Sequence, residues 1–162
     1  MKLIVALLII YISATSSYQI HPIKGINGTS ETINFDSKGN GYVVVNNNEH
    51  RHFYKINHRK QILWKISISS EVSRIIINSH DDVYVIFWPD EKEIIITIFN
   101  ENNFQFQNID SIRAFNFDLA TDGGGNIFYN RDDGVQLLTR HATTPKPIKN
   151  LEDYNFSGEK KN

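Results

Sequence analysis

The polar side chains that could hold a metal ion or a charged ligand gather in a few short segments of this sequence. The densest of them, residues 49–60, contains His50, His52 and His58. On a β-strand His50 and His52 would point to the same face, where two imidazoles could bind Zn²⁺ or Cu²⁺. Such a site needs a third and a fourth ligand, and His58 lies beyond the strand. We therefore expect a solvated hairpin tip of mixed charge and no metal site.

A second polar group surrounds the three glycines at residues 123–125, which Asp118, Asp122, Asp132 and Asp133 flank. The segment lacks the alternating acidic ligands and the terminal Glu of an EF-hand loop. It also lacks the Lys-Ser/Thr pair and the following helix of a phosphate-binding loop. A tight turn, in which glycine adopts backbone angles closed to other residues, explains the segment.

Nucleophilic chemistry has no support in the sequence. There is no cysteine and no Gly-x-Ser-x-Gly motif, so neither a thiolate nor the serine nucleophile of a typical hydrolase is available. We predict no catalytic residue and no cofactor.

These polar segments precede strands that repeat along the chain. An aromatic residue follows a turn at Tyr42, Tyr84 and Phe128, which are 42 and then 44 residues apart. A period of about 40 to 50 residues with four strands per unit is typical of β-propeller blades. We expect apolar strands before these aromatics at residues 32–35, 74–78 and 114–118, and after them at residues 52–56, 93–99 and 135–139. Outer strands are expected at residues 62–66 and 104–109.

The third unit contains the clearest hairpin. Strands are expected at residues 127–130 and 135–139, joined by a tight turn that contains Asp133-Gly134, a dipeptide preferred in hairpin loops. In the second unit, residues 83–88 and 93–99 are nearly continuous apolar runs, which indicates strands buried on both faces. We expect Trp64 and Trp88 to pack in the core.

Ile and Val dominate the apolar residues, and both favour strands. We predict an all-β fold, a β-propeller-like repeat of about three four-stranded blades within residues 31–150, at residues 31–69, 71–110 and 112–148. An ordinary β-sandwich or partial barrel is the alternative. Closed propellers have about four to eight blades. We therefore expect a shortened relative of a longer protein, self-association or a partner that completes the ring, or an incomplete propeller.

The ends of the chain predict a secreted protein. Residues 1–17 have the positive residue, the short apolar run and the small residues of a signal peptide. Residues 18–30 form a polar lead-in, and residues 151–162 a polar tail. N-glycosylation acceptors begin at Asn27 and Asn155. The net charge of −1 gives no electrostatic reason to bind nucleic acid or anionic membranes.

The segments at residues 35–43 and 117–138, with apolar strands around Asp-x-x-Gly-Asn and Asp-Gly-Val, resemble extracellular six-bladed propellers of the NHL and SMP-30/gluconolactonase type. Within that group the chain is most similar to the insect ommochrome-binding proteins, which are secreted, cysteine-poor carriers of a tryptophan-derived pigment. The chain matches only about half the length of that family.

The resemblance implies a secreted binding or carrier protein for a small aromatic ligand such as an ommochrome. Loops leading into the inner strands would line the ligand, and the predicted ligand-binding residues are Asn40, Asp81, Asp82, Asp122 and Asn126. One alternative is an SMP-30-like metal-dependent lactonase, for which Glu31, Asn126 and Asp118 would be the metal ligands. The other is an extracellular interaction protein, such as a secretion or venom component, without a small ligand.

Overall fold

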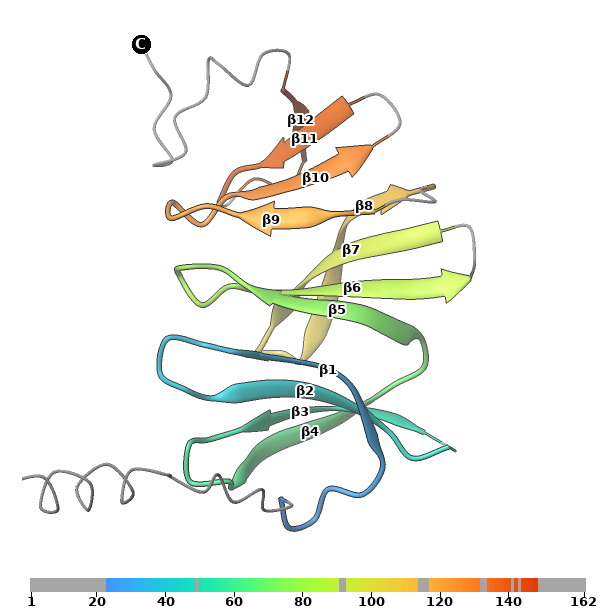
Figure 1. The fold of residues 1–162 in the computed structure, drawn as a ribbon, viewed down its shortest axis with the longest axis vertical. Coiled ribbons are helices and arrows are strands. Elements are labelled where there is room, and N and C mark those ends of the chain that lie inside the picture. Colours follow the sequence, from blue (N-terminus) through green and yellow to red (C-terminus); the bar gives the residue numbers. More distant parts are fainter. Residues whose placement is uncertain are drawn as a thin grey trace, which may run out of the picture.

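The computed structural model describes residues 23–48, 50–90, 93–113, 117–131, 134–140, 142 and 144–148. They form three separate four-stranded antiparallel sheets, in which the strands follow one another in chain order. Figure 1 shows the sheets stacked one after another. The predicted signal peptide, the polar tail and Asn155 lie outside the described residues.

The three sheets, which we call blades 1, 2 and 3, make up a partial β-propeller, as predicted. Blade 1 contains β1 (Thr29–Phe35), β2 (Gly41–Asn46), β3 (Arg51–Ile56) and β4 (Ile62–Ile68). Blade 2 contains β5 (Glu71–Ile77), β6 (Val83–Asp90), β7 (Glu93–Asn100) and β8 (Gln105–Ile112). Blade 3 contains β9 (Leu119–Thr121), β10 (Ile127–Arg131), β11 (Gly134–Leu138) and β12 (Lys146–Pro147). In the part of the chain that the structure describes, no helix is long and apolar enough to span a bilayer.

Two expected elements of blade 3 are wrong in detail. The inner strand is β9, at residues 119–121, and residues 117–118 of the expected strand at 114–118 precede it without strand structure. Gly134 pairs with Arg131 and begins β11, so it closes the hairpin as a strand residue, and Asp133-Gly134 is not the two-residue loop. Its φ of +124° is an angle that glycine adopts at little cost.

The core lies between the blades. Tyr42, Val44 and Phe53 of blade 1 pack against Val72, Ile75, Val83, Val85 and Phe99 of blade 2. The opposite face of blade 2 packs against Leu119, Ile127, Tyr129 and Leu138 of blade 3. Residues 83–86 are buried on both faces, as the apolar run predicted.

The two tryptophans differ. Trp64 is half-buried and its ring lies edge-on to Phe53, with the centroids 5.1 Å apart. Trp88 is 43% exposed, so the prediction that it packs in the core is wrong. The pairing of β6 with β7 is irregular between Phe87 and Asp90, which allows the end of β6 to project away from the core.

Candidate functional site

The turn between the first two strands has the same construction in all three blades. The first residue is Asp36, Asn78 or Asp122, and its backbone N–H donates to the carbonyl of the residue four positions later, at 3.0, 3.2 and 3.2 Å. Its side-chain oxygen accepts the N–H of that later residue, at 2.8, 2.9 and 2.8 Å. This is the Asx-type capping of a turn by its own side chain.

A second side-chain bond closes each turn. Asn40 donates its amide to Asp36 at 2.8 Å, and Asn126 donates to Asp122 at 2.8 Å. Blade 2 has the two residue types exchanged, since Asn78 donates to Asp82 at 2.9 Å. Every turn therefore pairs one carboxylate with one amide, and the predicted ligand residues Asn40, Asp122 and Asn126 act in this pairing.

Neighbouring turns bind each other, and this aligns the blades. Ser37 donates its N–H to Oδ1 of Asp81 at 2.7 Å and its hydroxyl to Oδ2 at 2.6 Å. At the next junction, Ser79 donates to the carbonyl of Gly123 at 2.9 Å, and Asn78 donates to the carbonyl of Gly125 at 2.9 Å. The hydrogen bonds from Ser37 lower the pKa of Asp81 below its ordinary value.

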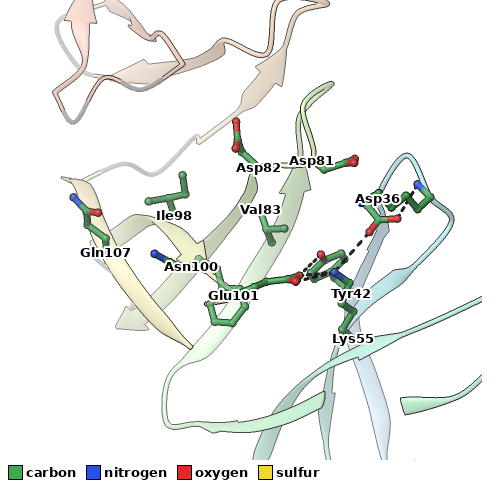
Figure 2. A pocket seen from close by; sticks show the side chains of 12 residues that line it. Asp36, Tyr42, Lys55, Asp81, Asp82, Val83, Ile98, Asn100, Glu101 and Gln107 are labelled. Atoms are coloured by element: carbon green, nitrogen blue, oxygen red, sulfur yellow. Dashed lines mark hydrogen bonds and ion pairs between the residues drawn. The ribbon is translucent and has the colours of Figure 1, made fainter. Parts of the chain in front are cut away.

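A cavity of about 430 Å³ opens between blades 1 and 2 beside these turns, and we call it the rim cavity (Figure 2). Asp81 and Asp82, two of the five predicted ligand residues, line it. The other lining residues are Asp36, Lys38, Tyr42, Lys55, Val83, Ile98, Phe99, Asn100, Glu101 and Gln107. Tyr42 and Phe99 are only 2% and 5% exposed, so the rim cavity presents polar groups and no open aromatic face.

A charged network forms one wall of the rim cavity. The Tyr42 hydroxyl donates to Glu101. The Nζ atom of Lys55 donates to both Glu101 oxygens, at 2.7 and 2.9 Å, and lies 4.8 Å from the centre of the Tyr42 ring. Burial, followed by the bond to Glu101, raises the pKa of Tyr42 well above its ordinary value. Sequence reasoning missed Lys55 and Glu101, because they are 46 residues apart and no local pattern connects them.

A second cavity, of about 300 Å³, lies where the β4–β5 linker passes over blade 2, and we call it the linker cavity. Its apolar wall includes the rings of Phe87 and Phe106, which meet edge-on with centroids 5.0 Å apart. Both rings are half-buried. The remaining lining residues are Ser67, Ile68, Ser69, Ser70, Ile95, Thr97 and Asn108. Sequence reasoning did not identify this cavity, because it depends on how the linker is placed over the neighbouring blade.

The residues considered for a metal site are separated. Glu31 accepts bonds from Asn46 at 3.0 Å and Arg51 at 2.8 Å within blade 1. Asp118 lies 3.5 Å from Arg74, and Asn126 pairs with its turn partner. Within the described residues, no three His, Cys, Asp or Glu side chains could together hold a metal ion.

The histidine pair also lies apart from any such cluster. The rings of His50 and His52 are 6.2 Å apart, and Nδ1 of His52 lies 3.3 Å from the Ser67 hydroxyl. Partial burial, then Lys65 and His50, lower the pKa of His52.

Asn27, the predicted N-glycosylation acceptor, is exposed. It lies beside Gly28, a position at which the structure requires glycine. Gly28 has a φ of +129°, and a Cβ atom there would lie 2.4 Å from the carbonyl oxygen of Asn46. Use of Asn27 as an N-glycosylation site stays a prediction.

Comparisons with known proteins support the fold and no particular family. No protein-family model matches the sequence, and no curated protein matches it. A protein of unknown function from Bacteroides caccae aligns with a TM-score of 0.50 and 15% identity, over 76% of this chain and 47% of that one. The β-propeller domain of Cps50 (Swd1) from Myceliophteria thermophila aligns with a TM-score of 0.44 and 10% identity, over 69% and 40% of the two chains. An uncharacterised protein from Listeria monocytogenes aligns with a TM-score of 0.49 and 10% identity, over 72% and 39%.

The chain thus spans between about two fifths and a half of the length of these structures. At such identities the similarity concerns the fold alone. The partial propeller rests on the three stacked four-stranded sheets themselves, whereas the resemblance to ommochrome-binding or SMP-30-type proteins receives no specific support.

Proposed function

We propose that this protein is a secreted, non-enzymatic binding protein for a small aromatic ligand, and that the ligand's ring lies in the linker cavity. The observation that supports the proposal is the half-buried pair Phe87 and Phe106, whose rings line the cavity and can contact a bound aromatic ring. Ligand sites combine such apolar walls with a few polar groups, in cavities of about 300–1,000 Å³. Ser69 and Ser70 of the β4–β5 linker are polar residues in the lining of this cavity.

The linker cavity suits an aromatic ring better than the rim cavity does. In the rim cavity the Lys55 ammonium is bonded to Glu101, Asp81 accepts bonds from Ser37, and the two aromatic side chains are buried. Placing an apolar ring against these charges would remove water from them without a replacement partner. The edges of Phe87 and Phe106 instead favour offset or edge-on contact with another ring.

Calorimetric titration with xanthurenic acid, a planar two-ring molecule, tests this proposal. Phe87→Leu keeps most of the side-chain volume and removes the ring. We expect the dissociation constant to rise about 2- to 10-fold, as loss of one aromatic contact of about 0.5–1.5 kcal/mol implies. Phe104→Leu is the matched control, because Phe104 is 47% exposed and does not line the linker cavity. Equal effects of the two substitutions, or no binding by the unmodified protein, would contradict the proposal.

The second candidate is an extracellular interaction protein without a small ligand. The exposed Ile33 and Phe35, at 52% and 58%, favour it, because large apolar side chains gathered on one face mark interaction surfaces. Absence of xanthurenic acid binding, together with capture of a protein partner through this face, is the result that it predicts.

A further inference from the structure

The three blades allow equivalent positions to be compared, and one of them is anomalous. Ile33, Ile75 and Leu119 each lie three residues before the first residue of their turn, on the face toward the preceding blade. Ile75 is 2% exposed beneath blade 1, and Leu119 is 8% exposed beneath blade 2. Ile33 is 52% exposed. The inner strand of blade 1 therefore exposes an apolar residue at a position that is buried in the other two blades.

The opposite flank of the structure has the matching surface. Phe53 and Ile96 lie on the faces that blades 1 and 2 turn toward the blade that follows them, and both are 0% exposed. The equivalent residue in blade 3 is Val135, which is only half-buried, with Leu137 beside the same face. A hollow of about 160 Å³ lies there, lined by Val135, Ala120 and neighbouring residues. No described strand packs on this face (Figure 1).

The junction between blades 1 and 2 shows how such flanks join. The edge of β5 that is not paired within its sheet meets side chains of β1. Asn34 donates to the carbonyl of Ile75 at 3.2 Å, and the N–H of Ile75 donates to Thr32 at 3.3 Å. In blade 3, Ala120 occupies the position that Asn34 has in blade 1. In blade 1, Ile33 occupies the position that Ile75 has in blade 2. The inner strands at these two flanks thus carry the two halves of one blade junction.

The lead-in segment limits where this junction can form. Ile23 and Ile26 pack on Val43, Val45, Tyr54 and Ile56, which covers the middle strands β2 and β3 of blade 1 on the face turned away from blade 2. This leaves Ile33 and Phe35 on the inner strand as the exposed apolar part. The Phe35 ring lies over Gly41, where a Cβ atom would be 3.2 Å from the ring.

We propose that two copies of this chain form a closed ring, in which blade 3 of each copy packs its Ala120 and Val135 face on the Ile33 and Phe35 face of the other. A two-fold axis then makes two identical junctions and leaves no free flank. Six blades lie within the range of about four to eight blades that closed propellers use. The proposal does not depend on the ligand proposed above.

Light scattering in solution tests the assembly. The unmodified protein is expected to have twice the mass of one chain. Ile33→Asp places a charge in both junctions and is expected to give a monomer. Leu63→Asp is the matched control, because Leu63 is 51% exposed on β4, at the opposite edge of the sheet from Ile33 on β1, and this variant should remain a dimer. A monomeric unmodified protein, or equal effects of the two substitutions, would overturn the proposal.

Cross-linking keeps the proposal testable if Ile33→Asp fails to fold. The chain has no cysteine, so Ile33→Cys combined with Ala120→Cys introduces two thiols with no native thiol to compete with them, and peptide mapping identifies a bond between residues 33 and 120. Residues 33 and 120 lie on opposite flanks, and the bond is expected to join two chains. Oxidation should therefore yield a covalent species that stops at two chains. A ladder of longer species would show an open filament, and a lack of cross-linking would show that the flanks do not meet; either result contradicts the ring.

Discussion

Ser37 of blade 1 holds Asp81 of blade 2 through both of its polar groups. Its backbone N–H and its hydroxyl reach separate oxygens of the carboxylate, at 2.7 and 2.6 Å. The two residues are 44 positions apart and belong to turns of the same construction. This contact joins the turns that form one edge of the rim cavity, so it links the repeat to the geometry of the candidate site.

The contact between Ser37 and Asp81 predicts sensitivity to acid. Because the pKa of Asp81 is lowered in the folded protein, its contribution is fully present above the ordinary value of 3.8 and is lost as the pH falls through the lowered value. Asp81→Asn should reduce the free energy of unfolding at pH 7 by about 1 kcal/mol, the usual value for a lost hydrogen bond. Thermal unfolding of both proteins between pH 7 and pH 2 measures this. The two curves should converge in acid, and parallel curves would argue against the contact.

The surroundings of Gly125 predict that a side chain at this position destabilises the protein. Its φ is +80°, and a Cβ atom there would lie 2.5 Å from Cδ2 of His80 on the neighbouring blade. Gly125→Ala should lower the free energy of unfolding by at least about 1 kcal/mol, through strain at a left-handed position and displacement of His80. Gly123→Ala is the control in the same turn, because nothing lies within 4 Å of a Cβ atom there. Chemical denaturation of both variants compares them, and equal stabilities would contradict the packing of this junction.

In the turn of blade 2 the carboxylate and the amide exchange positions. We therefore expect that the same exchange restores stability to a destabilised turn in blade 1. Asn40→Asp would place two carboxylates at the 2.8 Å contact with Asp36, and should cost about 1–3 kcal/mol of stability. Adding Asp36→Asn recreates the arrangement of Asn78 and Asp82, and should restore most of the loss. Denaturant unfolding of the single and double variants gives the coupling energy. A double variant no more stable than Asn40→Asp would show that the turns are not interchangeable.

Two buried tyrosines predict a loss of stability in alkali. The pKa of Tyr42 is raised far above 10, and burial followed by the nearby Asp82 raises the pKa of Tyr84 to about 12. Since the folded state favours the protonated form, stability is fully present below pH 10 and falls as the pH rises above it. Tyr42→Phe should flatten this decline in thermal unfolding measured from pH 9 to pH 11. Phenolate absorbance provides the second reading, and titration of Tyr42 near pH 10 in the folded protein would contradict its burial.

Local sequence signals predicted much of the fold. Tyr42, Tyr84 and Phe128 each lie two residues after the last residue of a turn of common construction, which explains why aligning them identified three blades. The Asp-x-x-Gly-Asn pattern predicted the turns of blades 1 and 3, because its Asp and Asn side chains bond to each other within five residues. Blade 3 was placed less well, since β9 has only three residues and gives little apolar pattern to recognise.

The cavities could not be predicted in the same way. Their walls combine residues from different blades, such as Tyr42 with Glu101, which are 59 residues apart. Loop position singled out Asp81 and Asp82, which line the rim cavity, and their role in ligand binding stays a prediction; it did not show that Asn40, Asp122 and Asn126 bond within their turns. The apolar character of the linker cavity depends on the half-buried state of Phe87 and Phe106, which an apolar run in the sequence does not reveal.

The most direct test of the proposed function is to locate xanthurenic acid on the isotope-labelled protein by amide chemical-shift mapping. Binding in the linker cavity should shift the amides of Ser69, Ser70 and Phe106 and leave those of Asp81 and Asp82 unchanged. Shifts at Asp81 and Asp82 alone would place the ligand in the rim cavity and contradict the assigned site. An unchanged spectrum at millimolar xanthurenic acid would contradict the aromatic-ligand proposal itself.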